Sequence, residues 1–140
     1  MNDADVGNIS RELLAELSGH GNLRRYAAGE VLITEGEVSD ALYVLVAGQL
    51  KVYTSDAKGR ELNYNILQPG EFFGEMGYIY GGEAPRQATA DAMTDLLLAE
   101  FEPEKLHAMS GGAQLQLTRA LVRNLVDRLV LANSRLTATQ

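Results

Sequence analysis

Residues 73–90 are rich in glycine and alanine, and they read Phe73-Gly74-Glu75-Met76-Gly77-Tyr78-Ile79-Tyr80-Gly81-Gly82-Glu83-Ala84-Pro85-Arg86-Gln87-Ala88-Thr89-Ala90. The backbone of such a run can approach a ligand closely. Between Glu61 and Glu104 the chain has nine acidic residues and one basic residue, Arg86. A guanidinium is a planar fork that binds two phosphate oxygens, and neighbouring backbone N–H groups add donors. The stretch therefore indicates a site for a single phosphate at Arg86.

Glu75 offers the complementary chemistry, because a carboxylate accepts hydrogen bonds from sugar hydroxyls. Taken alone, these residues favour plainer interpretations. Arg86 would then pair with Glu83 or Asp91 at the surface, and Glu75 would be an acid in the first turn of a helix. Gly81 and Gly82 would likewise form a turn rather than a phosphate cradle.

The residues around this stretch predict a mainly β domain. From Tyr26 to Phe101, short β-like runs alternate with glycines, a pattern typical of a sandwich or barrel-like roll. Ala41–Ala47 is apolar at every position and predicts a strand that is covered on both faces. The remaining signals are a strand with Leu50 and Val52 inward, a hairpin turn at Asp56–Gly59, a strand with Leu62, Tyr64 and Ile66 inward, and a closing strand at Leu96–Phe101.

Helices are expected at both ends of the β region. Residues 1–8 are expected to be a flexible tail, and Ser10 to cap an N-terminal helix within residues 9–21, with Leu13, Leu14 and Leu17 on one face. Residues 102–140 predict two C-terminal helices, a short one that begins near Pro103 and a long one that follows Ser110, Gly111 and Gly112.

The long helix has an apolar heptad seam through Thr118, Val122, Leu125, Leu129, Ala132 and Leu136. A second set widens its apolar surface, namely Leu117, Leu121, Val126, Val130 and Leu131. A helix that packs on one roll needs only a single apolar stripe. The surplus fits either a second partner, which would be another subunit or a ligand, or a core helix covered on all sides.

Composition excludes several classes of function. The chain has 140 residues, 46% of them hydrophobic, which suits one domain with a real core. Its net charge of −7 disfavours nucleic acid as a direct partner. Because there is no cysteine and only two histidines, His20 and His107, we expect no metal, no haem and no enzymatic site. No apolar run is long enough to cross a membrane and no signal peptide is evident, so a cytoplasmic location is expected.

The order of the motifs within residues 73–90 is more specific than any one of them. Phe73-Gly74-Glu75 and Pro85-Arg86-Gln87-Ala88-Thr89 resemble the two ends of the phosphate-binding cassette of cyclic nucleotide-binding domains. This family includes the catabolite activator proteins, the regulatory subunits of cyclic AMP-dependent protein kinase and cyclic nucleotide-gated channels. The upstream residues from Gly29 to Tyr53 also resemble the family's first strands, and the similarity extends from about Leu13 to Leu136.

The resemblance implies a mainly β fold, an eight-stranded antiparallel, jelly-roll-like β-roll at 22–101 with its cassette at 72–90. An N-terminal helix at 9–21 and two C-terminal helices at 102–140 would flank the roll. It also implies that Arg86 binds the exocyclic phosphate oxygens and Glu75 the ribose 2′-hydroxyl. The full set of expected ligand-binding residues is Phe73, Gly74, Glu75, Met76, Pro85, Arg86, Gln87, Ala88 and, on the last helix near the purine, Asn133 and Ser134.

The implied function is a regulatory sensor for a cyclic nucleotide, with cyclic AMP (cAMP) favoured over cyclic GMP (cGMP). Binding would move the last helix and alter the geometry of a homodimer formed through it, and the effector that it controls is unknown. The alternative is a ligand-free dimerisation or protein-interaction module on the same fold. Three features depart from the family pattern: the loop before Arg86 is long, Gln87 stands where a small residue is usual, and no helix-turn-helix follows.

Overall fold

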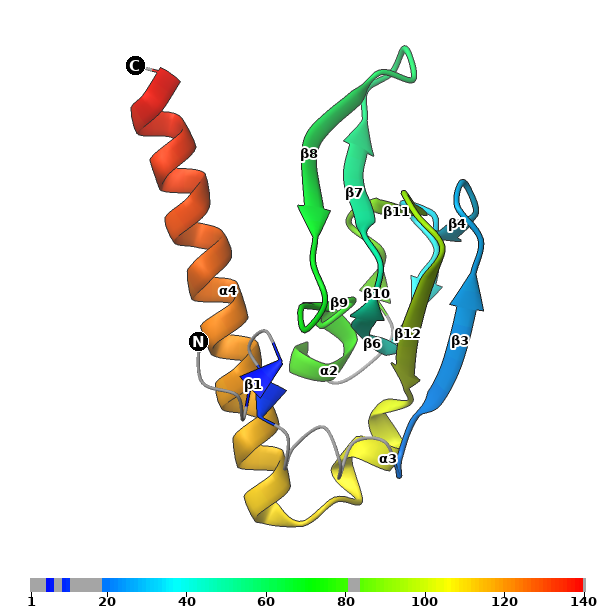
Figure 1. The fold of residues 1–140 in the computed structure, drawn as a ribbon, viewed down its shortest axis with the longest axis vertical. Coiled ribbons are helices and arrows are strands. Elements are labelled where there is room, and N and C mark those ends of the chain that lie inside the picture. Colours follow the sequence, from blue (N-terminus) through cyan, green and yellow to red (C-terminus); the bar gives the residue numbers. More distant parts are fainter. Residues whose placement is uncertain (1–4, 7–8, 11–18, 81–83, 140) are drawn as a thin grey trace.

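Two four-stranded antiparallel sheets form the body of the domain in the computed structural model, which describes residues 5–6, 9–10, 19–80 and 84–139 (Figure 1). One sheet has the strand order β4-β11-β7-β8, with β4 at Val31–Ile33, β11 at Thr89–Ala92, β7 at Leu50–Ser55 and β8 at Glu61–Leu67. The other has the order β3-β12-β6-β9, with β3 at Asn22–Tyr26, β12 at Leu96–Phe101, β6 at Leu42–Ala47 and β9 at Phe72–Phe73. These eight strands confirm the predicted mainly β roll.

Two short strand pairs accompany the roll. Strand β5 (Val38–Ser39) pairs with β10 (Ala84–Pro85), and β1 (Asp5–Val6) pairs with β2 (Ile9–Ser10). The second pair differs from the expectation of a tail over residues 1–8, and it places Ser10 in a strand rather than at a helix N-cap. The N-terminal helix was predicted within residues 9–21, and its residues Leu13, Leu14 and Leu17 fall in 11–18, which lie outside the described residues.

The core has two layers, one on each face of β6. Leu45 points between the two sheets and packs in a cluster with Leu50 and Leu98. Val44 points the other way, into a cluster with Phe101 and Leu117 that lies between the second sheet and the C-terminal helices. Successive side chains of a strand face opposite sides, so β6 is buried on both faces, as its apolar sequence predicts.

The β7–β8 hairpin forms at the predicted turn, where Gly59 adopts a φ of 79° that favours glycine. The predicted inward positions of Leu62 and Ile66 are wrong, because both are exposed whereas Leu67 is buried. The side chain of Tyr64, the third residue of that prediction, lies outside the described part of the structure. The pairing register explains this result. Leu50 lies opposite Leu67 and Val52 lies opposite Asn65, so the odd-numbered residues of β8 face inward at this end of the strand.

The C-terminal region forms α3 (Pro103–His107) and α4 (Gly111–Thr139), as predicted. The Ser110 hydroxyl accepts a hydrogen bond from the Ala113 N–H and caps α4, so the two glycines begin this helix rather than interrupt the chain. In Figure 1, α4 runs along one side of the roll. Helix α4 is not covered on all sides: Leu117 and Leu121 are buried in the core, whereas Val122, Leu125 and Leu129 of the predicted seam are exposed.

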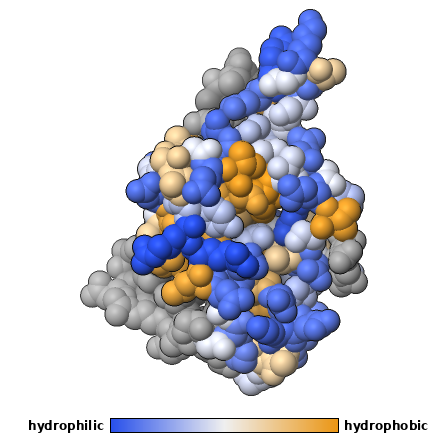
Figure 2. All heavy atoms as spheres, turned by 90° about the vertical axis from the view of Figure 1, so that its right-hand side faces the viewer, coloured by the Kyte–Doolittle hydropathy of each residue, from blue (hydrophilic) through white to orange (hydrophobic). Residues whose placement is uncertain are grey.

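Exposed apolar side chains are distributed unevenly over the surface. Strands β3 and β4 carry the exposed Leu23 and Val31. Figure 2 shows this side of the molecule, where apolar residues form small separate patches among polar ones. The apolar face of α4 is longer, because exposed residues recur along it from Val122 to Leu131. None of the helices in the described parts of the chain is both long and apolar enough to cross a membrane.

Candidate functional site

A cavity of about 170 Å³ lies between the inner face of the sheet that contains β7 and β8 and the segments on either side of α2 (Met76–Tyr80). The structure brings eight of the ten expected site residues to its wall. These are Phe73, Gly74, Glu75, Met76, Pro85, Arg86, Gln87 and Ala88. The other two residues, Asn133 and Ser134, are not part of the wall. Asn133 is exposed on α4, and the Ser134 side chain lies outside the described part of the structure.

Arg86 is buried, with 7% of its surface exposed. Its Nη1 donates to the Gly74 carbonyl at 3.2 Å, and its Nη2 donates to the Ala41 carbonyl at 2.8 Å and to Ser39 Oγ at 3.0 Å. Guanidinium has five N–H donors, so two remain. Arg86 pairs with no carboxylate among the described residues, so the plain interpretation of a surface pair with Asp91 is wrong. Glu83, the other partner considered, lies outside the described residues. A buried cation without a counter-ion favours an anionic ligand.

The backbone conformation of Gly74 and its lack of a side chain leave room for the Arg86 guanidinium. Its φ of +75° lies in the left-handed region, which side chains disfavour. A Cβ at this position would lie 2.6 Å from Arg86 Nη1 and 2.9 Å from the Ala41 carbonyl oxygen. Only glycine therefore allows both the backbone turn and the close approach of Arg86.

Two stacked aromatic rings lie beside Arg86. Tyr43 stacks on Phe73 with 4.9 Å between the ring centroids, and the guanidinium carbon of Arg86 lies 5.7 Å from the Tyr43 ring. Burial, together with the nearby Glu100 carboxylate, raises the pKa of Tyr43 to about 12. Tyr43 is therefore neutral at ordinary pH and adds no negative charge that would compete for Arg86.

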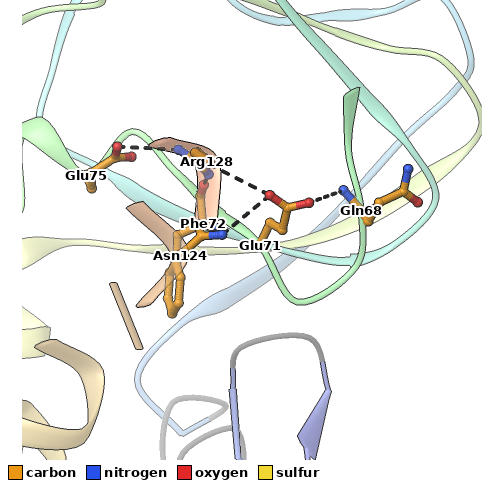
Figure 3. A network of polar contacts seen from close by, with 6 residues as sticks. All are labelled: Gln68, Glu71, Phe72, Glu75, Asn124 and Arg128. Carbon is orange, nitrogen blue, oxygen red and sulfur yellow. Dashed lines mark hydrogen bonds and ion pairs between the residues drawn. The ribbon is translucent and has the colours of Figure 1, made fainter. Parts of the chain in front are cut away.

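Glu75 also lines the cavity, and its carboxylate contacts helix α4. Its Oε1 is 3.5 Å from Arg128 Nη1, and the two side chains are 15% and 27% exposed. Arg128 Nη2 also donates to the Phe72 carbonyl (Figure 3). The plain interpretation of Glu75 as a first-turn helix acid is wrong, because Glu75 precedes α2, which has no acidic residue in its first turn. Its carboxylate instead connects the cassette to the last helix.

A second contact between α4 and the cassette lies one helical turn earlier. Asn124 is 2% exposed, accepts a hydrogen bond from the Phe72 N–H at 3.1 Å and donates to Glu71 Oε2 at 3.4 Å. Glu71 in turn lies 3.8 Å from Arg128 Nε and accepts from the Gln68 N–H (Figure 3). Helix α4 is thus held to β9 by buried polar contacts as well as by its apolar face.

Several residues of the wall were not expected from the sequence. Ser39 and Arg128 come from β5 and α4, far from the cassette in sequence, and no local motif marks them. Asn65 lines the cavity because the register of β8 places it opposite Val52, facing inward. The apolar remainder consists of inward residues of the sheet and comprises Ile33, Val52, Leu67 and Ala90.

The wall thus has charged and apolar parts with different uses. Arg86, Gln87 and Ala88 line the cavity, and the backbone N–H groups of Gln87 and Ala88 donate to no described residue. They suit an anion. Glu75 suits a hydroxyl-bearing group, and the apolar strand residues suit a flat ring. No group of three or more potential metal-ligating side chains occurs in the described ranges.

Comparison with known proteins identifies the family. The profile of the cyclic nucleotide-binding domain matches residues 23–110, more than half of the chain. The cAMP-activated global transcriptional regulator Vfr of Pseudomonas aeruginosa is 31% identical over 99 residues, which cover 69% of this chain and 46% of that protein. The chain therefore spans less than half of the length of this relative.

Solved structures of similar proteins have the same fold as this chain. The crystal structure of the Thermus thermophilus catabolite activator protein superposes with a TM-score of 0.73 at 27% identity, over 93% of this chain and 60% of that one. A structure from work on a cyclic-GMP-dependent signalling pathway of bacterial phytopathogenesis has a TM-score of 0.73 at 28% identity, over 88% of this chain and 96% of that one. The chain belongs to the cyclic nucleotide-binding domain family.

Proposed function

We propose that this domain is a sensor that binds a cyclic nucleotide without chemical change, and that cAMP is preferred over cGMP. The observation that carries the proposal is the buried Arg86 guanidinium, which lines the cavity and has no carboxylate partner within the described residues. A cyclic phosphate would supply the missing negative charge. The N–H groups of Gln87 and Ala88 would add hydrogen bonds to the same phosphate.

Glu75 gives the ligand its second attachment. Its carboxylate would accept a hydrogen bond from the ribose 2′-hydroxyl, which is free in a 3′,5′-cyclic nucleotide. The purine would then lie against the apolar strand residues, beside Asn65 and Arg128. Preference for cAMP rests on the relatives, since Vfr is described as cAMP-activated. The relative from a cGMP-dependent pathway makes cGMP the competitor to test.

We further propose that binding is transmitted through α4. The first part of this helix is anchored by Leu117 and Leu121, and burying two such side chains contributes roughly 3 to 6 kcal/mol. Beyond Asn124, the described side chains of α4 are exposed except for Arg128, which is partly buried against Glu75. A ribose at Glu75 changes the partners of Arg128, so the second part of α4 is the part that responds.

The same helix would form the homodimer. Its exposed apolar residues Val122, Leu125 and Leu129 follow the heptad spacing of a coiled pair. Moving a two-state equilibrium from 1:99 to 99:1 takes about 5.5 kcal/mol of differential affinity. One rearranged ion pair supplies only part of that, so apolar contacts of α4 must supply the rest. The effector is unknown, and the cytoplasmic location stays a prediction.

Thermal unfolding with added nucleotide tests the binding proposal. A ligand present at a hundred times its Kd stabilises by about 2.7 kcal/mol, which for a chain of this size raises Tm by roughly 10 °C. We expect such a shift with cAMP, a smaller shift with cGMP at the same concentration and none with 5′-AMP. Equal midpoints with and without every cyclic nucleotide would instead support the ligand-free interaction module.

A further inference from the structure

Ser39 reaches the cavity from outside the cassette. It lies in β5, and the pairing of Ser39 with Ala84 and of Val38 with Pro85 places it beside the start of the Pro85-Arg86 segment. The backbone of Arg86 is fixed on the same side, because its N–H donates to the Glu37 carbonyl at 2.7 Å and its carbonyl accepts from the Gly36 N–H at 2.9 Å. Ser39 therefore has a defined position relative to the guanidinium.

The Ser39 hydroxyl accepts two hydrogen bonds, and its O–H donor is not used by any described residue. Its oxygen accepts from Arg86 Nη2 at 3.0 Å and from the Ala41 N–H at 3.4 Å. A hydroxyl has two acceptor lone pairs and one O–H donor. Both lone pairs are thus directed at N–H groups, and the O–H has no acceptor among the described residues. Ser39 is partly exposed and lines the cavity, so the O–H is available to a ligand there.

We propose that the Ser39 O–H donates to an exocyclic oxygen of the phosphate that Arg86 binds. This inference rests on the proposed function and adds a donor from β5 to the phosphate site. An anion that accepts from the remaining guanidinium N–H groups lies within hydrogen-bond distance of Arg86. Ser39 Oγ also lies within hydrogen-bond distance of Arg86, so both groups contact the same guanidinium. Accepting from a cation also polarises the hydroxyl and strengthens the bond that it donates.

Ser39 could instead act only by orienting Arg86, and the two roles have different consequences. A donor to phosphate contacts one of the two exocyclic oxygens. A group that only orients Arg86 affects binding of the whole phosphate, whichever oxygen is altered. Replacing each exocyclic oxygen by sulfur in turn therefore separates the roles, because sulfur is a weak acceptor.

The experiment is a calorimetric titration of cAMP and its Rp and Sp phosphorothioate diastereomers. The proteins are the wild type, Ser39→Ala, Ser39→Thr and, as a matched control, Ser55→Ala in β7. We expect Ser39→Ala to weaken cAMP about tenfold, and this loss to disappear for one diastereomer only. Ser39→Thr, which keeps the hydroxyl, restores most of the affinity, and Ser55→Ala matches the wild type.

Two results would overturn the proposal on Ser39 while leaving nucleotide binding intact. One is an unchanged Kd for cAMP in Ser39→Ala. The other is an equal loss for both diastereomers, which would assign Ser39 to the orientation of Arg86 alone. If the wild type binds none of the three ligands, the proposed function fails and the Ser39 proposal fails with it. Equal apo midpoints of wild type and Ser39→Ala establish that the variant is folded.

Discussion

Replacement of Gly74 by alanine separates backbone strain from damage to the phosphate site. The new Cβ would lie 2.6 Å from Arg86 Nη1, whereas ordinary contact begins at 3.4 Å, so the guanidinium must retreat by roughly 0.8 Å. A non-glycine residue at the φ of +75° costs about 1 to 2 kcal/mol in addition. Gly59→Ala is the matched control, because its φ is +79° and its Cβ would meet nothing within 4 Å.

The backbone strain alone should cost each variant about 1 to 2 kcal/mol of stability, which is roughly 4 to 8 °C in Tm for a chain of this size. Gly74→Ala should lose more than Gly59→Ala, because its Cβ also meets Arg86 and the Ala41 carbonyl. Only Gly74→Ala should also lose affinity. Displacing a charged hydrogen bond costs about 1.5 to 3 kcal/mol, so its Kd for cAMP should rise by about 10- to 150-fold. Titration calorimetry on both variants measures this directly. Equal Kd values for Gly74→Ala and Gly59→Ala would refute the placement of the phosphate at Arg86.

Three further perturbations test the helix and the aromatic support. Arg128→Ala removes the ties to Glu75 and Phe72, so amide exchange in α4 beyond residue 124 should speed up about tenfold, while Arg123→Ala on the exposed face leaves it unchanged; equal protection in both would contradict the coupling route. Leu125→Asp places a charge in the exposed seam and should convert a dimer into a monomer by sedimentation, and an unchanged mass would contradict the dimer. Burial raises the pKa of Tyr43 from 10 to about 12, so the part of the unfolding free energy that depends on neutral Tyr43 is present below pH 10 and is lost as pH rises toward 12. The unfolding free energy of Tyr43→Phe, measured by denaturant titration, should fall less over this range. Identical pH profiles of the two proteins would contradict this.

The cassette was predictable because its signal is local. Gly74, Glu75 and Arg86 lie within thirteen consecutive residues, and their types and order specify a phosphate and a hydroxyl partner. The strand segments and the two C-terminal helices were also predictable, since apolar periodicity and turn residues determine them over short windows. These are features that a chain segment carries without knowledge of its neighbours.

The rest of the site depends on contacts between distant segments. Ser39 and Arg128 reach the cavity because β5 pairs with β10 and because α4 packs along β9. No sequence motif near either residue predicts these contacts. Asn65 was missed for a second reason. A register irregularity between Val52 and Thr54 changes which residues of β8 face inward, and a one-residue slip moves every side chain to the opposite face.

Helix α4 shows why amphipathic patterns can be ambiguous. Its sequence has two apolar faces, and either could cover the roll. The structure buries the face with Leu117 and Leu121 and exposes the seam residues Thr118, Val122, Leu125 and Leu129. The polar Asn124 decides between them, because its amide satisfies the Phe72 N–H and Glu71, and a buried amide requires such partners.

The most direct test is titration of cAMP into the wild type, Arg86→Ala and Arg25→Ala, an exposed arginine on β3 that lies outside the cavity. We predict one site per chain in the wild type and in Arg25→Ala with equal Kd. Arg86→Ala should bind at least about 30-fold more weakly, because losing a buried charged partner costs about 2 kcal/mol or more. Unchanged affinity in Arg86→Ala, or no binding by the wild type at millimolar cAMP, would contradict the account.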